Sequence, residues 1–343
     1  MGLPETYVPG FHNEELVKKM KYNVFGGTGL MISQLSIGTA GFSYLFGEYS
    51  ADKCREALVK ALKAGVNFID TAPWYGHGVS EELLGQFLKG IPRQAYYLGT
   101  KVARYEADPK LMFDFSAEKT RKSIDTSLKR LGVDYVDIIQ VHDIDFAKSL
   151  DIVINETLPV LEEAVKCGKA KYIGVTGYPV ATLAKCVNTS KTKIDTVLNY
   201  SRLSLLDSGL LKYINSFQEK NLGIINAAGL CLGLLTNGGP QPWHPASESV
   251  QNICSEAREY CKSQQVELAK LAMHYCYQQS GPHTNLVGMN TVELVDSNLD
   301  VLFNGLTKHE EMVFSHIQSN IFSKLKTGGD WEKEHNEYKE TLP

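Results

Sequence analysis

A regular alternation of short apolar runs and longer amphipathic stretches limits the folds open to this chain. From residue 34 onward, eight runs rich in aliphatic and β-branched residues are each followed by a stretch with helical periodicity. Such alternation predicts a parallel sheet, and eight units within about 270 residues fit a closed (β/α)8 barrel. The eight runs cover residues 35–40, 66–70, 96–101, 135–141, 171–175, 194–199, 222–226 and 285–288.

An open doubly wound sheet is the alternative arrangement of such units. That fold carries the turn G-x-G-x-x-G after its first strand, whereas here the run 35–38 is followed by Thr-Ala-Gly. We therefore expect an α/β protein of the barrel type. No linker interrupts the pattern, so residues 1–327 are predicted to form a single domain. Residues 1–32 are expected to cover the bottom of the barrel, and the charged tail 328–343 is expected to be mobile.

The composition argues against several classes of function. With a net charge of -4 over 343 residues and no basic stripe, the chain is not expected to bind nucleic acid. No apolar run approaches the roughly 20 residues that span a bilayer, so no membrane association is expected. The seven cysteines are scattered without C-x-x-C spacing, which argues against disulfides and a metal site and favours the reducing cytoplasm.

Two further properties of the chain are less constrained. A monomer is the default expectation for its oligomeric state. The start of the sequence, Met1 to Thr6, formally fits the myristoylation pattern M-G-x-x-x-S/T, and an ordinary unmodified start is the alternative.

Four side chains that can transfer or stabilise a proton follow three consecutive predicted strands. Asp70 ends the second run with Tyr75 in the loop behind it, Lys101 ends the third, and His142 follows the fourth. Barrel active sites form at the C-terminal ends of strands that lie about 4.8 Å apart, so these side chains are expected to converge. Each alone has a structural interpretation, such as a helix cap for Asp70. Their coincidence at three strand ends favours a catalytic site.

The chemistry of these residues suggests a role for each. A phenol with a pKa near 10 exchanges protons poorly at neutral pH, and a nearby ammonium lowers that pKa. Lys101 is the expected ammonium, oriented by an ion pair with Asp70. His142 is expected to hydrogen-bond the reacting oxygen, and Tyr75 to act as general acid/base. Because the sequence offers no nucleophile motif, this site suits hydride transfer at a carbon bearing a hydroxyl or carbonyl, with a cofactor as hydride partner.

Several blocks of the chain, between about residues 22 and 305, resemble the aldo-keto reductases. The blocks are DTAPWYGHGVSEELLG, GTKVARY, SLKRLGVDYVDIIQVHD and IGVTGYP. The resemblance implies a (β/α)8 barrel, a nicotinamide cofactor extended across its C-terminal mouth, and the tetrad Asp70, Tyr75, Lys101 and His142 in the roles given above. Within the family, TAPWYGHG, DFSAEKTRKS and LVGMN look most like dehydrogenases of L-galactose, D-arabinose or L-fucose. Those enzymes oxidise the anomeric carbon of a free sugar to its lactone with NAD.

The resemblance also implies a cofactor site, with several departures from the family pattern. Where the family has Ser-Asn after the fifth strand, this chain has Thr176-Gly177, and the usual Gln that ends the sixth strand is Asn199. Ala227 stands where an aromatic residue often stacks on the nicotinamide, which puts that stacking in doubt. The residues that the resemblance assigns to the cofactor are Gly38, Thr39, Thr176, Gly177, Asn199, Ala227, Gly229, Leu230, Gly233, Gly288, Met289, Asn290 and Asn298.

The last predicted strand favours NAD over NADP. Members of the family that prefer NADP follow this strand with a Lys and, six residues later, an Arg, which bind the 2′-phosphate. In this chain these positions hold Gly288 and Leu294, and the nearby Glu293 and Asp296 would repel a phosphate. NAD is therefore the expected cofactor.

Three functions are compatible with the sequence. The favoured one is an NAD(P)-dependent oxidoreductase that oxidises a free aldose to its lactone. The alternatives are an NADPH-dependent reductase of aldehydes, ketones or steroids, and a non-catalytic cofactor-sensing subunit of a larger assembly. A small-molecule substrate needs aromatic and polar side chains around the mouth, although loop aromatics equally pack one loop on another. The expected pocket residues are Phe42, Tyr44, Trp74, Arg104 and Tyr178.

Overall fold

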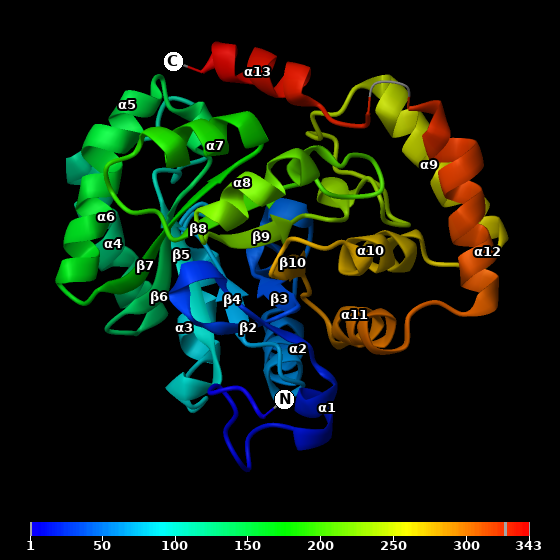
Figure 1. Ribbon diagram of the computed structural model, residues 1–343, viewed down its shortest axis with the longest axis horizontal. Coiled ribbons are helices and arrows are strands. Elements are labelled where there is room, and N and C mark those ends of the chain that lie inside the picture. The colour runs from blue at the N-terminus through cyan, green and yellow to red at the C-terminus, as the bar shows by residue number, and fades with distance from the viewer. Residues whose placement is uncertain (1, 326–327, 343) are drawn as a thin grey trace.

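The centre of the molecule is a closed barrel of eight parallel strands (Figure 1). The structure, a computed structural model, describes residues 2–325 and 328–342. Around the barrel the order is β10-β3-β4-β5-β6-β7-β8-β9, and each predicted run is one of these strands, so the (β/α)8 barrel is confirmed. The strands are β3 (Leu35–Gly38), β4 (Phe68–Asp70), β5 (Tyr97–Val102), β6 (Val136–Val141), β7 (Ala170–Gly177), β8 (Thr196–Tyr200), β9 (Gly223–Ala227) and β10 (Thr284–Gly288).

Helices connect successive strands and surround the barrel (Figure 1). One clear case is α4, where Ser116 accepts a hydrogen bond from the N–H of Lys119 at the start, and Gly132 ends the helix with φ of 66°. The helices are α1 (Glu14–Lys19), α2 (Ala51–Lys63), α3 (Val79–Phe87), α4 (Ala117–Leu131), α5 (Leu150–Ile152), α6 (Leu158–Lys166), α7 (Val180–Thr189), α8 (Ile214–Glu219), α9 (Glu248–Ser263), α10 (Leu268–Gln278), α11 (Val292–Asn304), α12 (Lys308–His316) and α13 (Glu332–Thr341). Among the described residues, no helix is both long and apolar enough to cross a membrane.

An N-terminal hairpin closes the bottom of the barrel, as expected for residues 1–32. It consists of β1 (Tyr22–Val24) and β2 (Met31–Ser33), which pair in antiparallel fashion. The backbone N–H of Gly27 donates to the carbonyl of Asn221, just before β9 begins. The hairpin region and the barrel strands share one buried cluster, which therefore fills the barrel from below. Its main members are Phe25, Leu30, Ile32, Phe68, Ile138, Leu198, Ile225 and Leu286.

The C-terminal tail, expected to be mobile, forms the helix α13 and packs against the rest of the molecule. Trp331 precedes this helix and is 1% exposed, and His335 within it is also buried. In Figure 1 the tail runs along the edge of the molecule opposite the N-terminus. The charged composition was misleading because two buried aromatic side chains are enough to anchor a short polar helix.

Candidate active site

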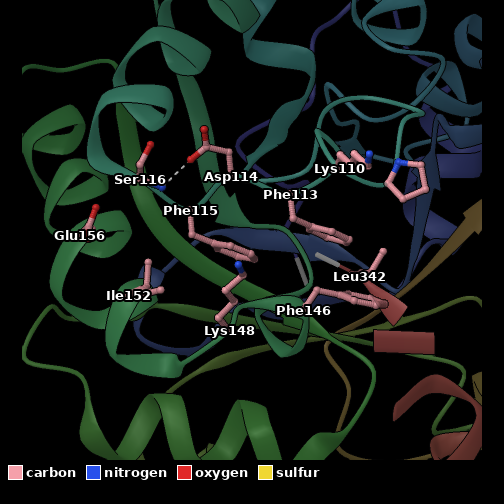
Figure 2. A pocket seen from close by; sticks show the side chains of 11 residues that line it. Lys110, Phe113, Asp114, Phe115, Ser116, Phe146, Lys148, Ile152, Glu156 and Leu342 are labelled. Atoms are coloured by element: carbon pink, nitrogen blue, oxygen red, sulfur yellow. Dashed lines mark hydrogen bonds between the residues drawn. The ribbon is translucent and has the colours of Figure 1, made fainter. Parts of the chain in front are cut away.

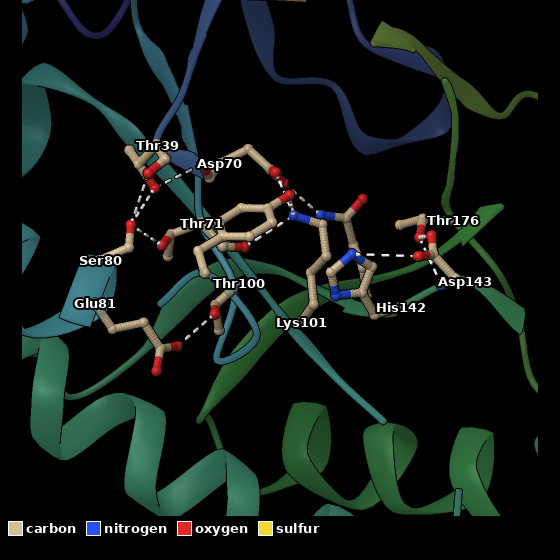
Figure 3. Close-up of polar contacts among 12 residues, drawn as sticks. Thr39, Asp70, Thr71, Ser80, Glu81, Thr100, Lys101, His142, Asp143 and Thr176 are labelled. Atoms are coloured by element: carbon tan, nitrogen blue, oxygen red, sulfur yellow. Dashed lines mark hydrogen bonds and ion pairs between the residues drawn. The ribbon is translucent and has the colours of Figure 1, made fainter. Parts of the chain in front are cut away.

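The four predicted catalytic side chains meet at the C-terminal ends of neighbouring strands: Figure 3 shows Asp70, Lys101 and His142 there, and the hydroxyl of Tyr75 accepts a hydrogen bond from Lys101. Asp70 is the last residue of β4, Lys101 lies near the end of β5, and His142 follows β6 directly. Register places β4 beside β5 and β5 beside β6, which brings these residues together. Tyr75 returns from the loop after β4, with its ring 5.8 Å from that of His142 and perpendicular to it.

Lys101 is the hub of this cluster. Its ammonium is buried and forms an ion pair with Asp70. Nζ also donates to the carbonyl of Thr71 across 2.9 Å and to the hydroxyl of Tyr75 across 3.2 Å. With these three acceptors the hydrogen-bonding capacity of the ammonium is used, so its position beside the phenol is fixed.

Gln140 is a further member of the site that sequence reasoning missed. Its Nε2 donates to Asp70 Oδ2 across 2.7 Å, so it holds the carboxylate oxygen that Lys101 does not take. Gln140 is two residues before His142 and pairs in register with Lys101. Period-two alternation along β6 was the signal that could have found it, because residues two apart in a strand point to the same face.

Burial and charge act in opposite directions on the proton of Tyr75. Burial raises the pKa of the Tyr75 phenol, and the ammonium of Lys101 partly offsets that rise. Lys101 lowers the pKa of Tyr75, as predicted. The net shift of this pKa is nevertheless upward, whereas we expected a downward shift. Although burial alone would lower the pKa of Lys101, Asp70 and Tyr75 together raise it, so the side chain is an ammonium.

His142 is a neutral imidazole. Burial lowers its pKa well below the usual range, and the positive charges of Lys101 and Arg104 lower it further. Nδ1 is buried without a hydrogen-bond partner among the described residues, and Nε2 lies 3.7 Å from Asp143 Oδ2. A neutral imidazole has one N–H to donate, which suits a hydrogen bond to a reacting oxygen.

The ends of β7 and β8 contain a cradle that fits the carboxamide of a nicotinamide. Asn199 donates from Nδ2 to the carbonyls of Gly177 and Tyr178, at 2.8 and 2.9 Å. Its Oδ1 is buried and has no hydrogen-bond partner among the described residues. An unused buried acceptor is costly unless a ligand supplies the donor, and an amide N–H would do so. Thr176, by contrast, already bonds Asp143 through its hydroxyl.

The structure explains why glycine occupies position 177. A Cβ on Gly177 would collide with Oδ1 of Asp145, the carboxylate on the loop after β6. Asp145 Oδ1 also accepts from the backbone N–H of Tyr178, and Oδ2 pairs with His335 Nε2 across 2.6 Å. A carboxylate thus fills the space of the side chain that the family pattern has here.

The remaining predicted cofactor residues lie at or just after the ends of β3, β9 and β10, except Asn298, which lies in α11. Gly38 and Gly288 are register partners, and Thr39 donates to the carbonyl of Asp70. Ala227, the last residue of β9, is buried beside the half-buried Tyr200, its register partner on β8. Tyr200 is thus an aromatic neighbour of the position where the family pattern has its stacking ring, and sequence reasoning missed it.

Several residues predicted to contact the cofactor already take part in hydrogen bonds within the protein. In the loop after β9, which contains Gly229 and Leu230, the N–H of Gly233 donates to the carbonyl of Leu230. After β10, Met289 is buried and Asn290 donates to the carbonyl of Gly41. Asn298 accepts from the hydroxyl of Tyr277 and donates to the carbonyl of Leu294. Their cofactor roles stay predictions.

Two of the five predicted pocket residues lie together near the tetrad. The guanidinium of Arg104 stacks over Trp74 at 4.2 Å and pairs with Asp143, the residue after His142. Of the other three, Phe42 is buried against Phe87, Tyr44 is 74% exposed, and Tyr178 is buried and stacked on Trp331. Their contacts with a substrate stay predictions.

The C-terminal tail holds the loops at this end of the barrel. Trp331 stacks on Tyr178 at 5.0 Å, and its backbone N–H donates to the Tyr178 hydroxyl. Arg202, just after β8, pairs with Glu332 at 2.5 Å and with Asp207 at 2.6 Å. Together with the Asp145–His335 pair, these contacts connect the tail to the loops after β6, β7 and β8.

A hollow of about 290 Å³ lies beside the site but is not lined by the tetrad (Figure 2). Leu342 of the tail and residues of the loops after β5 and β6 surround it. Two of its rings, Phe113 and Phe146, are stacked 4.6 Å apart and also contact the guanidinium of Arg104. The hollow therefore borders the wall of the candidate site.

Comparisons with known proteins agree with this geometry. The chain is 38% identical over 284 residues to L-galactose dehydrogenase of Arabidopsis thaliana, covering 82% of this chain and 88% of that protein. It is 32% identical to D-arabinose 1-dehydrogenase of Saccharomyces cerevisiae, covering 85% and 91%. An aldo-keto reductase structure from Bacillus halodurans, in its holo form, matches with a TM-score of 0.69 and 26% identity over 87% of this chain and 96% of that one.

The model of the Aldo/keto reductase family matches residues 34–317, which include all eight barrel strands and the tetrad. The resemblance read from the sequence is thereby confirmed. The chain belongs to the aldo/keto reductase family and is an oxidoreductase acting on CH–OH or carbonyl groups.

Proposed function

We propose that this protein is an NAD-dependent aldose 1-dehydrogenase that oxidises the anomeric carbon of a free sugar to its lactone. The observation that carries the chemistry is the 3.2 Å contact between the Tyr75 hydroxyl and the Lys101 ammonium, beside a neutral His142. Similarity to L-galactose dehydrogenase and D-arabinose 1-dehydrogenase supports the choice of a sugar as substrate.

In this mechanism Tyr75 is the general base of the oxidation. The anomeric hydroxyl is held between the Tyr75 phenolate and the N–H of His142. As the C1–H bond breaks, Tyr75 accepts the hydroxyl proton and the C1–O bond becomes the lactone carbonyl. Lys101 stabilises the phenolate before the transfer, and Asp70 and Gln140 hold Lys101 in place. A nicotinamide, when bound, accepts the hydride.

We propose that Asn199 and the loops after β9 and β10 hold this cofactor, as the family resemblance implies. The charges near β10 favour NAD. Gly288 and Leu294 stand at the two positions that bind a 2′-phosphate in NADP-preferring relatives, and neither carries a positive charge. Both are exposed, and a Cβ added at Gly288 would meet no other atom. Lys60 on α2 is close, but it pairs with Asp296 at 2.5 Å. A phosphate there would compete with this carboxylate.

Cofactor choice is tested by titrating tryptophan fluorescence with NADH and NADPH. We expect the natural protein to bind NADH more tightly. The double variant Gly288→Lys/Leu294→Arg installs the two cations of NADP-preferring relatives in open space, and should shift the affinity ratio toward NADPH by about tenfold or more. Tighter NADPH binding by the natural protein would overturn the choice of NAD and favour the carbonyl reductase alternative.

A further inference from the structure

A buried ion pair lies beside the proposed acid/base group and has no part in the mechanism above. Arg104 donates to Asp143 Oδ2 across 2.7 Å, and the two side chains are 19% and 3% exposed. The same carboxylate oxygen is 3.7 Å from Nε2 of His142 (Figure 3). The pair therefore adjoins the imidazole that holds the reacting oxygen.

The backbone and the neighbouring strand fix the carboxylate of Asp143. Its φ of 55° and ψ of 64° are in the left-handed region that residues other than glycine rarely adopt. The N–H of Asp143 donates to Thr176 Oγ1 across 2.9 Å, and the Thr176 hydroxyl donates to Asp143 Oδ1 across 3.1 Å. Strain of this kind persists where the surroundings hold it, and it is concentrated at functional sites.

Aromatic rings fix the guanidinium of Arg104 in the same way. It lies 4.2 Å from the ring of Trp74 and 5.1 Å from that of Phe113. Such contacts hold a planar cation by cation–π attraction and restrict its rotation. Both members of the pair are therefore oriented before a substrate arrives.

Both members also keep unused hydrogen-bonding capacity. A carboxylate offers about four acceptor positions, of which Arg104 and Thr176 each take one. The Nε of Arg104 is buried and has no partner among the described residues, and its NH2 group makes a 3.8 Å contact with the sulfur of Met112. A hydroxyl group of a substrate can donate one hydrogen bond and accept others. It could therefore donate to the carboxylate of Asp143 and accept from the guanidinium of Arg104.

We propose that Asp143 and Arg104 together bind the hydroxyl on the carbon next to the reacting carbon, and so select sugars over simple aldehydes and alcohols. This inference rests on the proposed function. The reacting oxygen lies at Tyr75 and His142 in the proposed mechanism, and Asp143 Oδ2 is 3.7 Å from His142 Nε2. A hydroxyl on the carbon next to the reacting carbon is therefore within hydrogen-bonding reach of the Asp143–Arg104 pair. A substrate without that hydroxyl leaves the buried pair unsatisfied, which is the source of the selectivity.

The test compares sugars that differ only at this hydroxyl. D-arabinose and 2-deoxy-D-ribose differ by the presence of the hydroxyl at C2. We expect kcat/KM of the natural protein to favour D-arabinose by about 10²-fold or more. In Asp143→Asn and in Arg104→Met this preference should fall to within about fivefold. L-galactose and L-fucose differ at the remote C6, so their ratio should not change.

A second ion pair of the same type provides the control. Arg93 pairs with the buried Asp137 at 2.6 Å and stacks on Tyr135 at 4.4 Å, at the opposite ends of β5 and β6. Asp137→Asn should leave the sugar preference unchanged. Titration with NADH verifies that each variant retains a folded cofactor site, and Arg104→Met carries the test if Asp143→Asn does not fold.

The outcomes separate this inference from the proposed function. If the Asp143 and Arg104 variants lose activity equally on both sugars, the pair has only a structural role and the inference is wrong. If the natural protein oxidises no aldose, the proposed function fails instead. Hydroxyl selection is then measured in the reverse direction, with lactaldehyde against propanal and NADH, and equal rates for these two would overturn the inference.

Discussion

At the scale of single residues, the contact between Tyr75 and Lys101 governs how the reaction responds to pH. Oxidation needs the phenolate of Tyr75, whereas reduction needs the phenol. Burial raises the Tyr75 pKa and Lys101 opposes that rise. Oxidation should therefore become faster as pH rises toward the Tyr75 pKa, with the increase on the alkaline side of neutrality, and reduction should become slower over the same range.

The pH profile of kcat for sugar oxidation checks this expectation. In Lys101→Met the phenolate loses its ammonium, so the alkaline rise should move to higher pH and the rate at neutral pH should fall. A profile that is flat across the neutral and alkaline range would show that Tyr75 ionisation does not limit the reaction.

Removing only the hydroxyl of Tyr75 should separate catalysis from binding. Tyr75→Phe keeps the ring against His142 but has no proton to transfer. We expect kcat to fall by about 10²- to 10⁴-fold, the usual contribution of a positioned acid/base. NADH affinity, measured by fluorescence, should stay within about twofold. Full turnover in this variant would rule out Tyr75 as the acid/base.

Position 177 should tolerate no side chain. In Gly177→Ala the new Cβ would collide with Asp145, which is itself held by His335 and the N–H of Tyr178. We expect a loss of about 1–3 kcal/mol in the free energy of unfolding, measured with urea. Gly288→Ala is the matched control, because its Cβ enters open space. Equal stability of both variants would contradict the packing described for Gly177.

At the scale of elements, the strands and their ends were predictable and the loops between them were not. Period-two and helical patterns are local, so they locate β4, β5 and β6 and the residues Asp70, Lys101 and His142 that follow from them. The contact between Asp145 and His335 joins positions 190 residues apart, and no local pattern reports it. For the same reason the sequence could not decide whether Phe42 and Tyr178 line the mouth or pack one loop on another, and both side chains are buried.

The docking of α13 illustrates how a local pattern misleads. Its sequence is charged, yet its anchor is Trp331, which stacks on Tyr178. Trp331→Ala should weaken docking by about 3–5 kcal/mol and speed hydrogen exchange of the α13 amides by about two orders of magnitude or more. Trp243→Ala, at a tryptophan that is 48% exposed, is the matched control. Unchanged exchange in the Trp331 variant would mean that other contacts hold the tail.

At the scale of the whole molecule, different parts of the chain contact the two ends of the barrel. The N-terminal hairpin fills the bottom with apolar side chains such as Phe25 and Ile32. The C-terminal tail holds the loops at the top through ion pairs and aromatic stacking. The apolar end carries stability, while the polar end keeps the buried charges of Lys101, Asp143 and Arg104 in fixed positions for chemistry.

The most direct test of the proposed function is the formation of NADH from NAD and a free aldose, followed by absorbance. The natural protein should form NADH with L-galactose, D-arabinose or L-fucose, more efficiently than it forms NADPH from NADP, and Tyr75→Phe should form almost none. If no sugar yields NADH while NADPH reduces simple aldehydes or ketones, the protein is a carbonyl reductase and the aldose dehydrogenase proposal is wrong.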